Sequence, residues 1–250
     1  MPSFLAEKES AALRERLSGV LQRIADAAER SGRSPESVTL VCIAKKHSPE
    51  VVAELATLWP GPGPLIIGEN YLQEGLEKQT AVRAFLRAPA SKLPLWHFTG
   101  HLQSRKARDI PENFALLHTL DSEKLASALQ KQLRLLGDIP PLPVLIQVNV
   151  GREPQKSGVL PEDAEALAKV VTTMPELALK GFMCIPPLDG EVEDSRRHFA
   201  ALRTLRDTIA ASLGIDVPEL SMGMSHDLEA AIEEGATMVR VGTDIFGTRA

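Results

Sequence analysis

A lysine that directly follows an apolar run is the most reactive candidate in this chain. The run VTLVCIA ends at Ala44, and Lys45 and Lys46 come next. Many lysines leave a strand only to reach water, and that structural interpretation stays open here. Partial burial would instead disfavour the ammonium and lower the pKa of Lys45, so that its neutral amine could attack an aldehyde and form a Schiff base. If the alternation of the strand continues, the two lysines point to opposite sides.

Polar residues at the ends of the last two apolar runs could bind an anion. Ser225 ends ELSMGMS and precedes the helical pattern HDLEAAIEEG, so we expect its hydroxyl to cap that helix, whose first amides attract anions. Gly242 and Thr243 follow MVRV, where a glycine permits close approach of the backbone and a threonine supplies a hydroxyl. A capped helix and a turn at a strand end would explain the same residues without a ligand.

One arginine and two histidines lie inside apolar runs. Because a buried arginine is costly unless it is well paired, Arg240 in MVRVG predicts either a structural carboxylate partner or a side chain that faces a cavity. His97 and His118 are more typical of hydrogen-bonded packing residues than of catalysts. His97, Asp121 and Asp227 lack the spacing of metal ligands, and neither H-E-x-x-H nor C-x-x-C occurs, so we expect no metal site. No G-x-S-x-G supports a serine hydrolase.

Eight short apolar runs can bring these side chains together. In chain order they are VTLVCIA, PLIIGE, PLWHFTG, ALLHTLD, PVLIQVNV, LKGFMCI, ELSMGMS and MVRVGTDIFG. Helical patterns separate them, at about 48–58, 71–88, 104–109, 122–136, 162–173, 191–213 and 226–235, and an amphipathic helix over 3–30 precedes the first run. Alternating strands and helices indicate a parallel sheet, and a closed barrel gathers the carboxyl ends of its strands into one mouth.

We therefore predict an α/β fold, a single (β/α)8 TIM barrel over residues 1–250 with an extra N-terminal helix. The alternative is an open, doubly wound sheet. Such a sheet prefers a glycine-rich turn after its first strand, and the segment AKKHSPE contains no glycine.

Composition narrows the class of protein. The chain has 44% hydrophobic and 24% charged residues and a net charge of −5, and no long basic run predicts a nucleic-acid surface. No apolar run approaches the roughly 20 residues of a membrane span, and charges from Glu7 onward argue against a signal peptide. Cys42 and Cys184 fall inside predicted strands, so we expect buried free thiols and a cytoplasmic protein.

Seven segments in fixed order resemble the pyridoxal 5′-phosphate homeostasis protein family. They are CIAKKHSPEVV, IGENYLQEGLEK, WHFTGHLQSRKAR, LHTLD, VLIQVNV followed by KSG, GFMCIP, and SMGMSHDLEAAIEEGATMVRVGTDIFGTR. The resemblance runs from about Leu40 to Arg249. This chain departs from the usual family pattern at Ala44-Lys45-Lys46 (commonly Ser-Lys-Thr), at Arg105 (commonly Asn) and at His226 (commonly Asp).

The resemblance implies a barrel like the N-terminal domain of alanine racemase, with pyridoxal 5′-phosphate held as a Schiff base on Lys45. It also implies a role in the cofactor site for eight further residues: Ser225, Gly242 and Thr243 at the phosphate, Arg240 at the pyridine nitrogen, Asn70 and His97 along the ring, and Ser221 and Met222 at the same rim.

The type of the groups around the ring bears on catalysis. Arginine stays protonated and only donates, so a pyridine nitrogen opposite Arg240 remains unprotonated and the ring is a weaker electron sink. Two-base racemisation would also need a second base, which alanine racemases take from a tyrosine of another domain, whereas the one tyrosine here is Tyr71.

We therefore expect a non-catalytic binding protein that serves intracellular vitamin B6 homeostasis, a monomer by family resemblance, with pyridoxal-phosphate-dependent apoenzymes as recipients. A racemase acting on amino acids is the alternative. A lysine aldolase acting on a phosphorylated sugar is a more distant one.

Overall fold

The computed structural model describes residues 4–61, 63–187 and 191–247. Eight parallel strands form a closed barrel in chain order, because the last strand pairs with the first. The strands are β1 (Thr39–Ile43), β2 (Ile66–Glu69), β3 (Leu95–Phe98), β4 (Leu116–Leu120), β5 (Leu142–Gln147), β6 (Leu177–Met183), β7 (Glu219–Ser221) and β8 (Met238–Val241). The predicted (β/α)8 barrel is confirmed, and the open sheet is not the fold.

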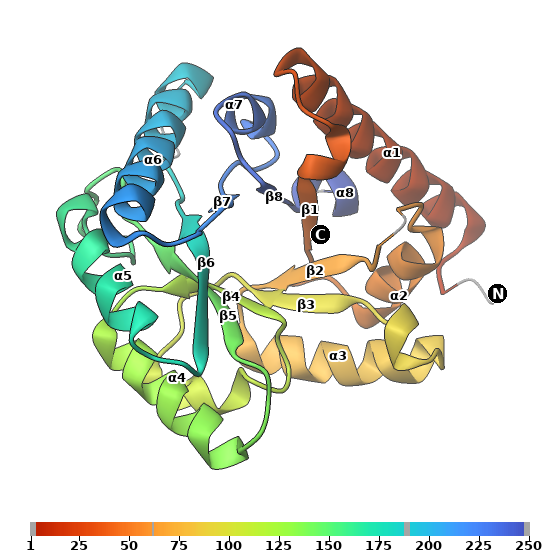
Figure 1. Cartoon of the computed structure of the whole chain (residues 1–250). Helices are drawn as coiled ribbons and strands as arrows, with labels where there is room; N and C mark the ends of the chain where they lie inside the picture. Colours follow the sequence, from red (N-terminus) through yellow and green to blue (C-terminus); the bar gives the residue numbers. More distant parts are fainter. Residues whose placement is uncertain (1–3, 62, 188–190, 248–250) are drawn as a thin grey trace.

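Helices form a ring around the strands (Figure 1). They are α1 (Glu7–Arg30), α2 (Pro49–Leu58), α3 (Leu72–Leu86), α4 (Glu123–Leu136), α5 (Ala164–Thr172), α6 (Val192–Leu213), α7 (Leu228–Glu233) and α8 (Thr243–Phe246). Between β3 and β4 the crossover is the short 3₁₀ helix η3 (Ser104–Asp109), where the sequence predicted a helix of unspecified type. None of the helices within the described ranges has the length and apolar character that crossing a membrane requires. The end of the last motif, residues 248–250, lies outside the described residues.

The leading amphipathic helix forms as predicted and covers the region where the last strand, β8, meets the first strand, β1. In α1 the apolar face buries Leu13, Leu17, Val20 and Ile24, while Leu21 is only partly buried. The helix packs against α7 and α8, on either side of β8, as Figure 1 shows at the upper right. Because α8 follows β8 directly, α1 packs against the segment that comes immediately after the last strand.

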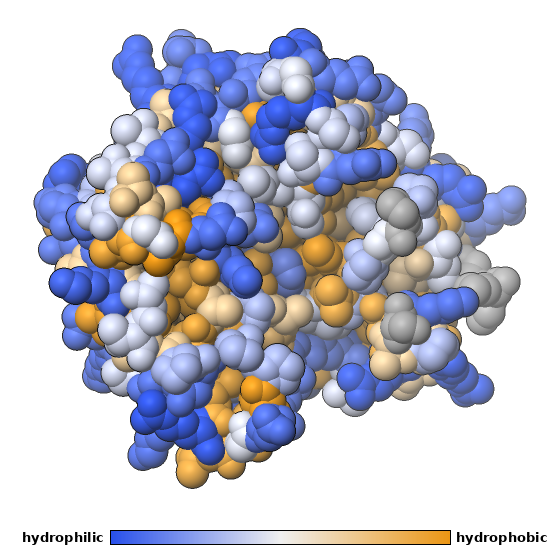
Figure 2. All heavy atoms as spheres, viewed as in Figure 1, coloured by the Kyte–Doolittle hydropathy of each residue, from blue (hydrophilic) through white to orange (hydrophobic). Residues whose placement is uncertain are grey.

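The barrel has two cores on opposite faces of its strands. Inside it lies a small apolar layer of Val41, Leu116, Leu145, Met183 and Met238. The other strand face packs under the helices in a much larger cluster, while hydrophilic side chains dominate the outer rim of the face seen in Figure 2. Strands buried on both faces explain why the sequence shows continuous apolar runs rather than alternation.

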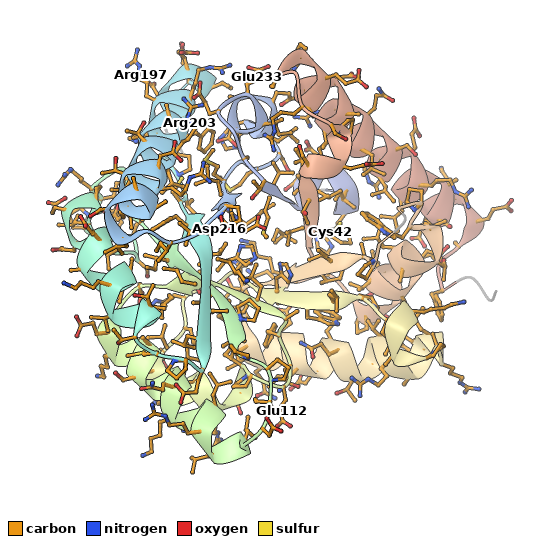
Figure 3. All side chains as sticks on the ribbon, in the orientation of Figure 1. Cys42, Glu112, Arg197, Arg203, Asp216 and Glu233 are labelled. Carbon is orange, nitrogen blue, oxygen red and sulfur yellow. The ribbon has the colours of Figure 1, made fainter. Side chains whose placement is uncertain are left out.

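Cys42 lies on the helix-facing side of β1, while Cys184 directly follows β6 rather than lying inside a strand, and both belong to the outer core. Cys42 and Cys184 are both free and wholly buried, as the sequence predicts, and Figure 3 shows Cys42 deep within the molecule on β1. Burial raises the pKa of both thiols, because the charged thiolate is poorly solvated there. These thiols are therefore structural.

Candidate functional site

A cavity of about 250 Å³ opens at the carboxyl ends of the strands, where barrel active sites lie. We call it the mouth cavity. Its lining combines six predicted site residues with six that the sequence did not assign to the site: Lys45, Asn70, Ser225, Arg240, Gly242 and Thr243, and Ile43, His47, Thr99, Ile185, Met224 and His226. Side chains from both ends of the chain therefore meet at one place.

Strand alternation explains why Lys45 faces the cavity. Val41 points into the barrel and Ile43 lies on the same face, while Cys42 and Ala44 belong to the outer core. Two residues further on, Lys45 is half-buried and lines the mouth cavity. Lys46 is exposed, and its backbone takes the left-handed conformation with φ +65°.

Asn70 reaches the cavity because a glycine lets two loops touch. A Cβ atom on Gly100 would lie 2.0 Å from the carbonyl oxygen of Asn70, so only glycine fits at this contact. The hydroxyl of Thr99 donates to the side-chain oxygen of Asn70 at 3.0 Å. The amide of Asn70 is thereby fixed at the edge of the mouth cavity.

Arg240 is buried, and it lines the cavity rather than pairing with a structural carboxylate. Its Nη1 donates to Ser221 Oγ and its Nη2 to the carbonyl oxygen of Cys184, both at 2.8 Å. Within the described residues no carboxylate forms an ion pair with it. Desolvation lowers the pKa of Arg240, while the nearby Cys184 and Asp227 act against that shift. The cavity-facing alternative is the one observed.

A chain of polar side chains inside the barrel holds Arg240 from behind. Ser221 Oγ lies 2.9 Å from His118 Nδ1, and His118 Nε2 lies 3.0 Å from His97 Nδ1. Desolvation lowers the pKa of His97 to about 4 and that of His118 well below its usual range. Both rings are therefore neutral at pH 7 and act as hydrogen-bonding groups.

Three of the predicted site residues do not line the cavity. His97 and Ser221 belong to the polar chain behind Arg240, and Met222 is wholly buried in the outer core. Contact of His97, Ser221 and Met222 with a bound ring stays a prediction.

Ser225 faces the cavity but does not cap α7, so that expectation is wrong. The N-cap of α7 is Asp227, and its Oδ1 accepts a hydrogen bond from the Met224 amide at 2.7 Å. The carboxylate of Asp227 thus organises the turn in which Ser225 lies. The hydroxyl of Ser225 is left for the cavity, which Gly242 and Thr243 line from the start of α8.

The sequence contained signals for some of the residues it missed. Thr99 stands two residues after His97, and it therefore shares its inward face. His226 directly follows Ser225, and its Nε2 lies 3.1 Å from Asp227 Oδ2. No local spacing predicted that His47 lines the cavity. Its ring stacks on that of Phe246, with 4.8 Å between the ring centroids. The third departure from the family pattern, Arg105, is exposed and bonds to Gln103.

Apart from Asn70, none of the predicted site residues lines the other hollows. A cavity of about 200 Å³ adjoins the mouth cavity and shares Asn70, Thr99 and Ile185 with it, so the two form one opening. A hollow of about 300 Å³ lies near the amino-terminal ends of β3 and β4, and one of about 890 Å³ lies between α1 and α2. Among the described residues no group of three or more His, Cys, Asp or Glu could hold a metal ion.

Outside the barrel, a polar seam joins α6 to α7. Arg203 and Glu233 mark the two sides of this seam in Figure 3. Arg196 Nη2 binds Glu233 Oε2 at 2.7 Å, and Arg203 Nη1 binds Glu234 Oε2 at 3.1 Å. These ion pairs lie on the outer layer and make no contact with the mouth cavity.

Comparison with known proteins gives a consistent picture. A sequence model of the family described as alanine racemase, N-terminal domain, matches residues 20–250. The pyridoxal phosphate homeostasis protein of Pseudomonas aeruginosa is 45% identical over 236 residues, which cover 94% of this chain and 95% of the relative. That of Aquifex aeolicus is 42% identical over 94% of this chain and 97% of its own. The solved structure of PipY from Synechococcus elongatus with pyridoxal phosphate bound is 32% identical, with a TM-score of 0.77 over 94% of this chain and 100% of that one.

Proposed function

The chain belongs to the pyridoxal phosphate homeostasis protein family, and we propose that it holds pyridoxal 5′-phosphate in the mouth cavity as a Schiff base on Lys45. One observation supports this most: Lys45 and Arg240 line the same cavity as the Ser225 and Thr243 hydroxyls. The protein serves intracellular vitamin B6 homeostasis in this proposal.

The charges of the mouth cavity fit such a ligand. Two cationic side chains and two histidines line it, and no described lining residue is acidic. A cavity lined by one sign of charge attracts ligands of the opposite sign. Pyridoxal 5′-phosphate is an anion with a flat ring, and its aldehyde condenses reversibly with a lysine amine, releasing water.

In this proposal, four side chains that line the mouth cavity have distinct roles. Lys45 supplies the amine from the first strand. Arg240, which can only donate, faces the ring nitrogen and keeps a proton off it. The hydroxyls of Ser225 and Thr243 donate hydrogen bonds to the phosphate.

We propose a carrier rather than a catalyst. A two-base racemase needs a tyrosine at the site, and Tyr71, the only tyrosine of this chain, is 51% exposed and does not line the mouth cavity. Arg240 also leaves a bound ring a weak electron sink. A monomeric, cytoplasmic carrier would shield the aldehyde from stray amines and release the cofactor to apoenzymes that need it.

The test is spectroscopic and chemical. Purified protein mixed with pyridoxal 5′-phosphate should show the visible absorbance of a Schiff base, which Lys45→Ala abolishes. Borohydride should then fix the label on the peptide that contains Lys45. A label on another lysine would refute the assignment. Turnover of D- or L-amino acids at the rate of dedicated racemases would refute the carrier role.

A further inference from the structure

A buried ion cluster lies directly behind Lys45, between β2 and α3. Lys78 is 3% exposed and Glu69 is fully buried, and Lys78 Nζ binds Glu69 Oε1 at 2.5 Å. The same Nζ donates to Glu74 Oε1 at 2.8 Å and to the carbonyl oxygen of Ala44 at 2.6 Å. An ammonium has three donors, so Lys78 uses all of them here. The segment IGENYLQEGLEK contains all three charged residues.

This cluster fixes the backbone on both sides of Lys45. On one side, Lys78 binds the carbonyl of Ala44, which also accepts from the His47 amide at 3.1 Å. On the other side, the amide of Lys46 donates to Glu74 Oε1. Lys46 has the left-handed conformation that a non-glycine residue rarely adopts. Two side-chain contacts therefore hold the turn that carries Lys45.

Stability alone explains this arrangement poorly. Replacing a buried ion pair with apolar residues of similar volume is often neutral or stabilising, because both charges lose their hydration. In addition, Glu69 Oε2 is buried and has no hydrogen-bond partner among the residues that the structure describes. An apolar contact between β2 and α3 would avoid both costs, but it could not bind the Ala44 carbonyl.

We propose that Lys78, oriented by Glu69 and Glu74, is a positioning residue that fixes the backbone around Lys45 and so aims its amine into the mouth cavity. This inference rests on the proposed function. It separates two properties of the site. The cluster governs how fast the covalent bond to the aldehyde forms. It leaves the binding of the phosphate unchanged, because the cluster lies between β2 and α3 whereas Ser225 and Thr243 follow β7 and β8.

The experiment compares two ligands on three variants. Pyridoxal 5′-phosphate can form the covalent bond, whereas pyridoxine 5′-phosphate carries an alcohol in place of the aldehyde and cannot. Stopped-flow absorbance measures the rate of bond formation with the first, and competition measures the affinity of the second. Lys78→Met and Glu74→Ala test the cluster. Glu77→Ala is the control, because Glu77 is exposed on the same helix and, within the described part of the chain, accepts a side-chain hydrogen bond only from Gln73.

We expect bond formation to slow about 100-fold in Lys78→Met and about 10-fold in Glu74→Ala, because small misplacements of a reacting group cost that much. Affinity for pyridoxine 5′-phosphate should change less than about twofold. The control should behave as the original chain. Unchanged rates in both variants, or equal losses with both ligands, would overturn the proposal.

A measurement on the cofactor-free protein decides the case if Lys78→Met fails to fold. Hydrogen exchange of the Lys46 amide should be faster in Glu74→Ala than in Glu77→Ala, since only the first removes its acceptor. Equal exchange would overturn the proposal. If the original chain itself forms no covalent bond to pyridoxal 5′-phosphate, the proposed function fails. Normal bond formation in every variant defeats only the role of the cluster.

Discussion

Two sides of the barrel mouth are each held from outside by a cation, but the two cations lie in different environments. On the Lys45 side, Lys78 is buried and binds the carbonyl oxygen of Ala44. On the neighbouring side, formed by the ends of β7 and β8, Arg23 of α1 is 34% exposed, and its Nη2 binds the carbonyl oxygen of Ser225 at 2.8 Å. Arg23 also binds Glu229 Oε1 at 2.6 Å and Asp244 Oδ2 at 2.5 Å.

The difference indicates that the two sides need different accuracy. Covalent attack requires an amine held within a narrow range of distance and angle, so a rigid, buried support suits Lys45. An anion is attracted by charge over a longer range, and a partly hydrated support suffices for the loops that carry Ser225 and Thr243. Water and salt weaken the contacts of Arg23 far more than those of Lys78.

The largest expected effect lies on the buried side. Lys78→Met should lower the free energy of unfolding by about 3–5 kcal/mol, because it leaves the buried Glu69 carboxyl, whose pKa burial already raises, without its partner. Denaturant unfolding of the cofactor-free protein measures this. Combining Lys78→Met with Glu69→Gln should recover most of the loss. If the double variant is as unstable as Lys78→Met alone, the loss of stability does not come from the unpaired Glu69 carboxyl.

An effect of intermediate size on the free energy of unfolding is expected from the polar chain of His97 and His118 inside the barrel. Because the folded-state pKa of His97 is lowered from 6.5 to about 4, the unfolded chain binds an extra proton between these values. The stability due to neutral His97 is complete above pH 6.5 and is lost as the pH falls toward 4, by about 3 kcal/mol. Unfolding measured from pH 7 to pH 4 should show a shallower pH dependence in His97→Asn. An identical slope in both proteins would contradict the burial of a neutral ring.

The smallest effect is expected on the exposed side. Arg23→Gln should cost about 1 kcal/mol or less, because partly exposed ion pairs contribute little. Affinity for pyridoxine 5′-phosphate should fall by no more than about fivefold, and the difference should fade near 1 M salt. The rate of bond formation with non-phosphorylated pyridoxal should not change. A loss as large as that of Lys78→Met would remove the contrast between the two sides.

Local pattern predicted the barrel, because the apolar runs indicate the strands and their order. For Lys45 it left two interpretations open, and the structure shows the side chain at the mouth cavity, on the face of Val41. The prediction that Ser225 caps α7 was wrong, because Asp227 occupies the N-cap position of this helix.

Contacts between distant segments could not be predicted. Arg23 lies 202 residues from Ser225 and 221 from Asp244, and no spacing rule joins them. The contact of Lys78 with the Ala44 carbonyl spans 34 residues and involves a backbone group that carries no sequence signal. The position of His97 behind Arg240, rather than along the cavity wall, depends on how the strands tilt in the closed barrel.

A crystal structure of the protein with pyridoxal 5′-phosphate would show where the cofactor is bound. We predict continuous density between Lys45 Nζ and the cofactor, with the ring nitrogen within hydrogen-bond distance of Arg240. We also predict the phosphate beside the Ser225 and Thr243 hydroxyls. Density joined to another lysine, or a phosphate placed away from Ser225 and Thr243, would contradict the proposed function.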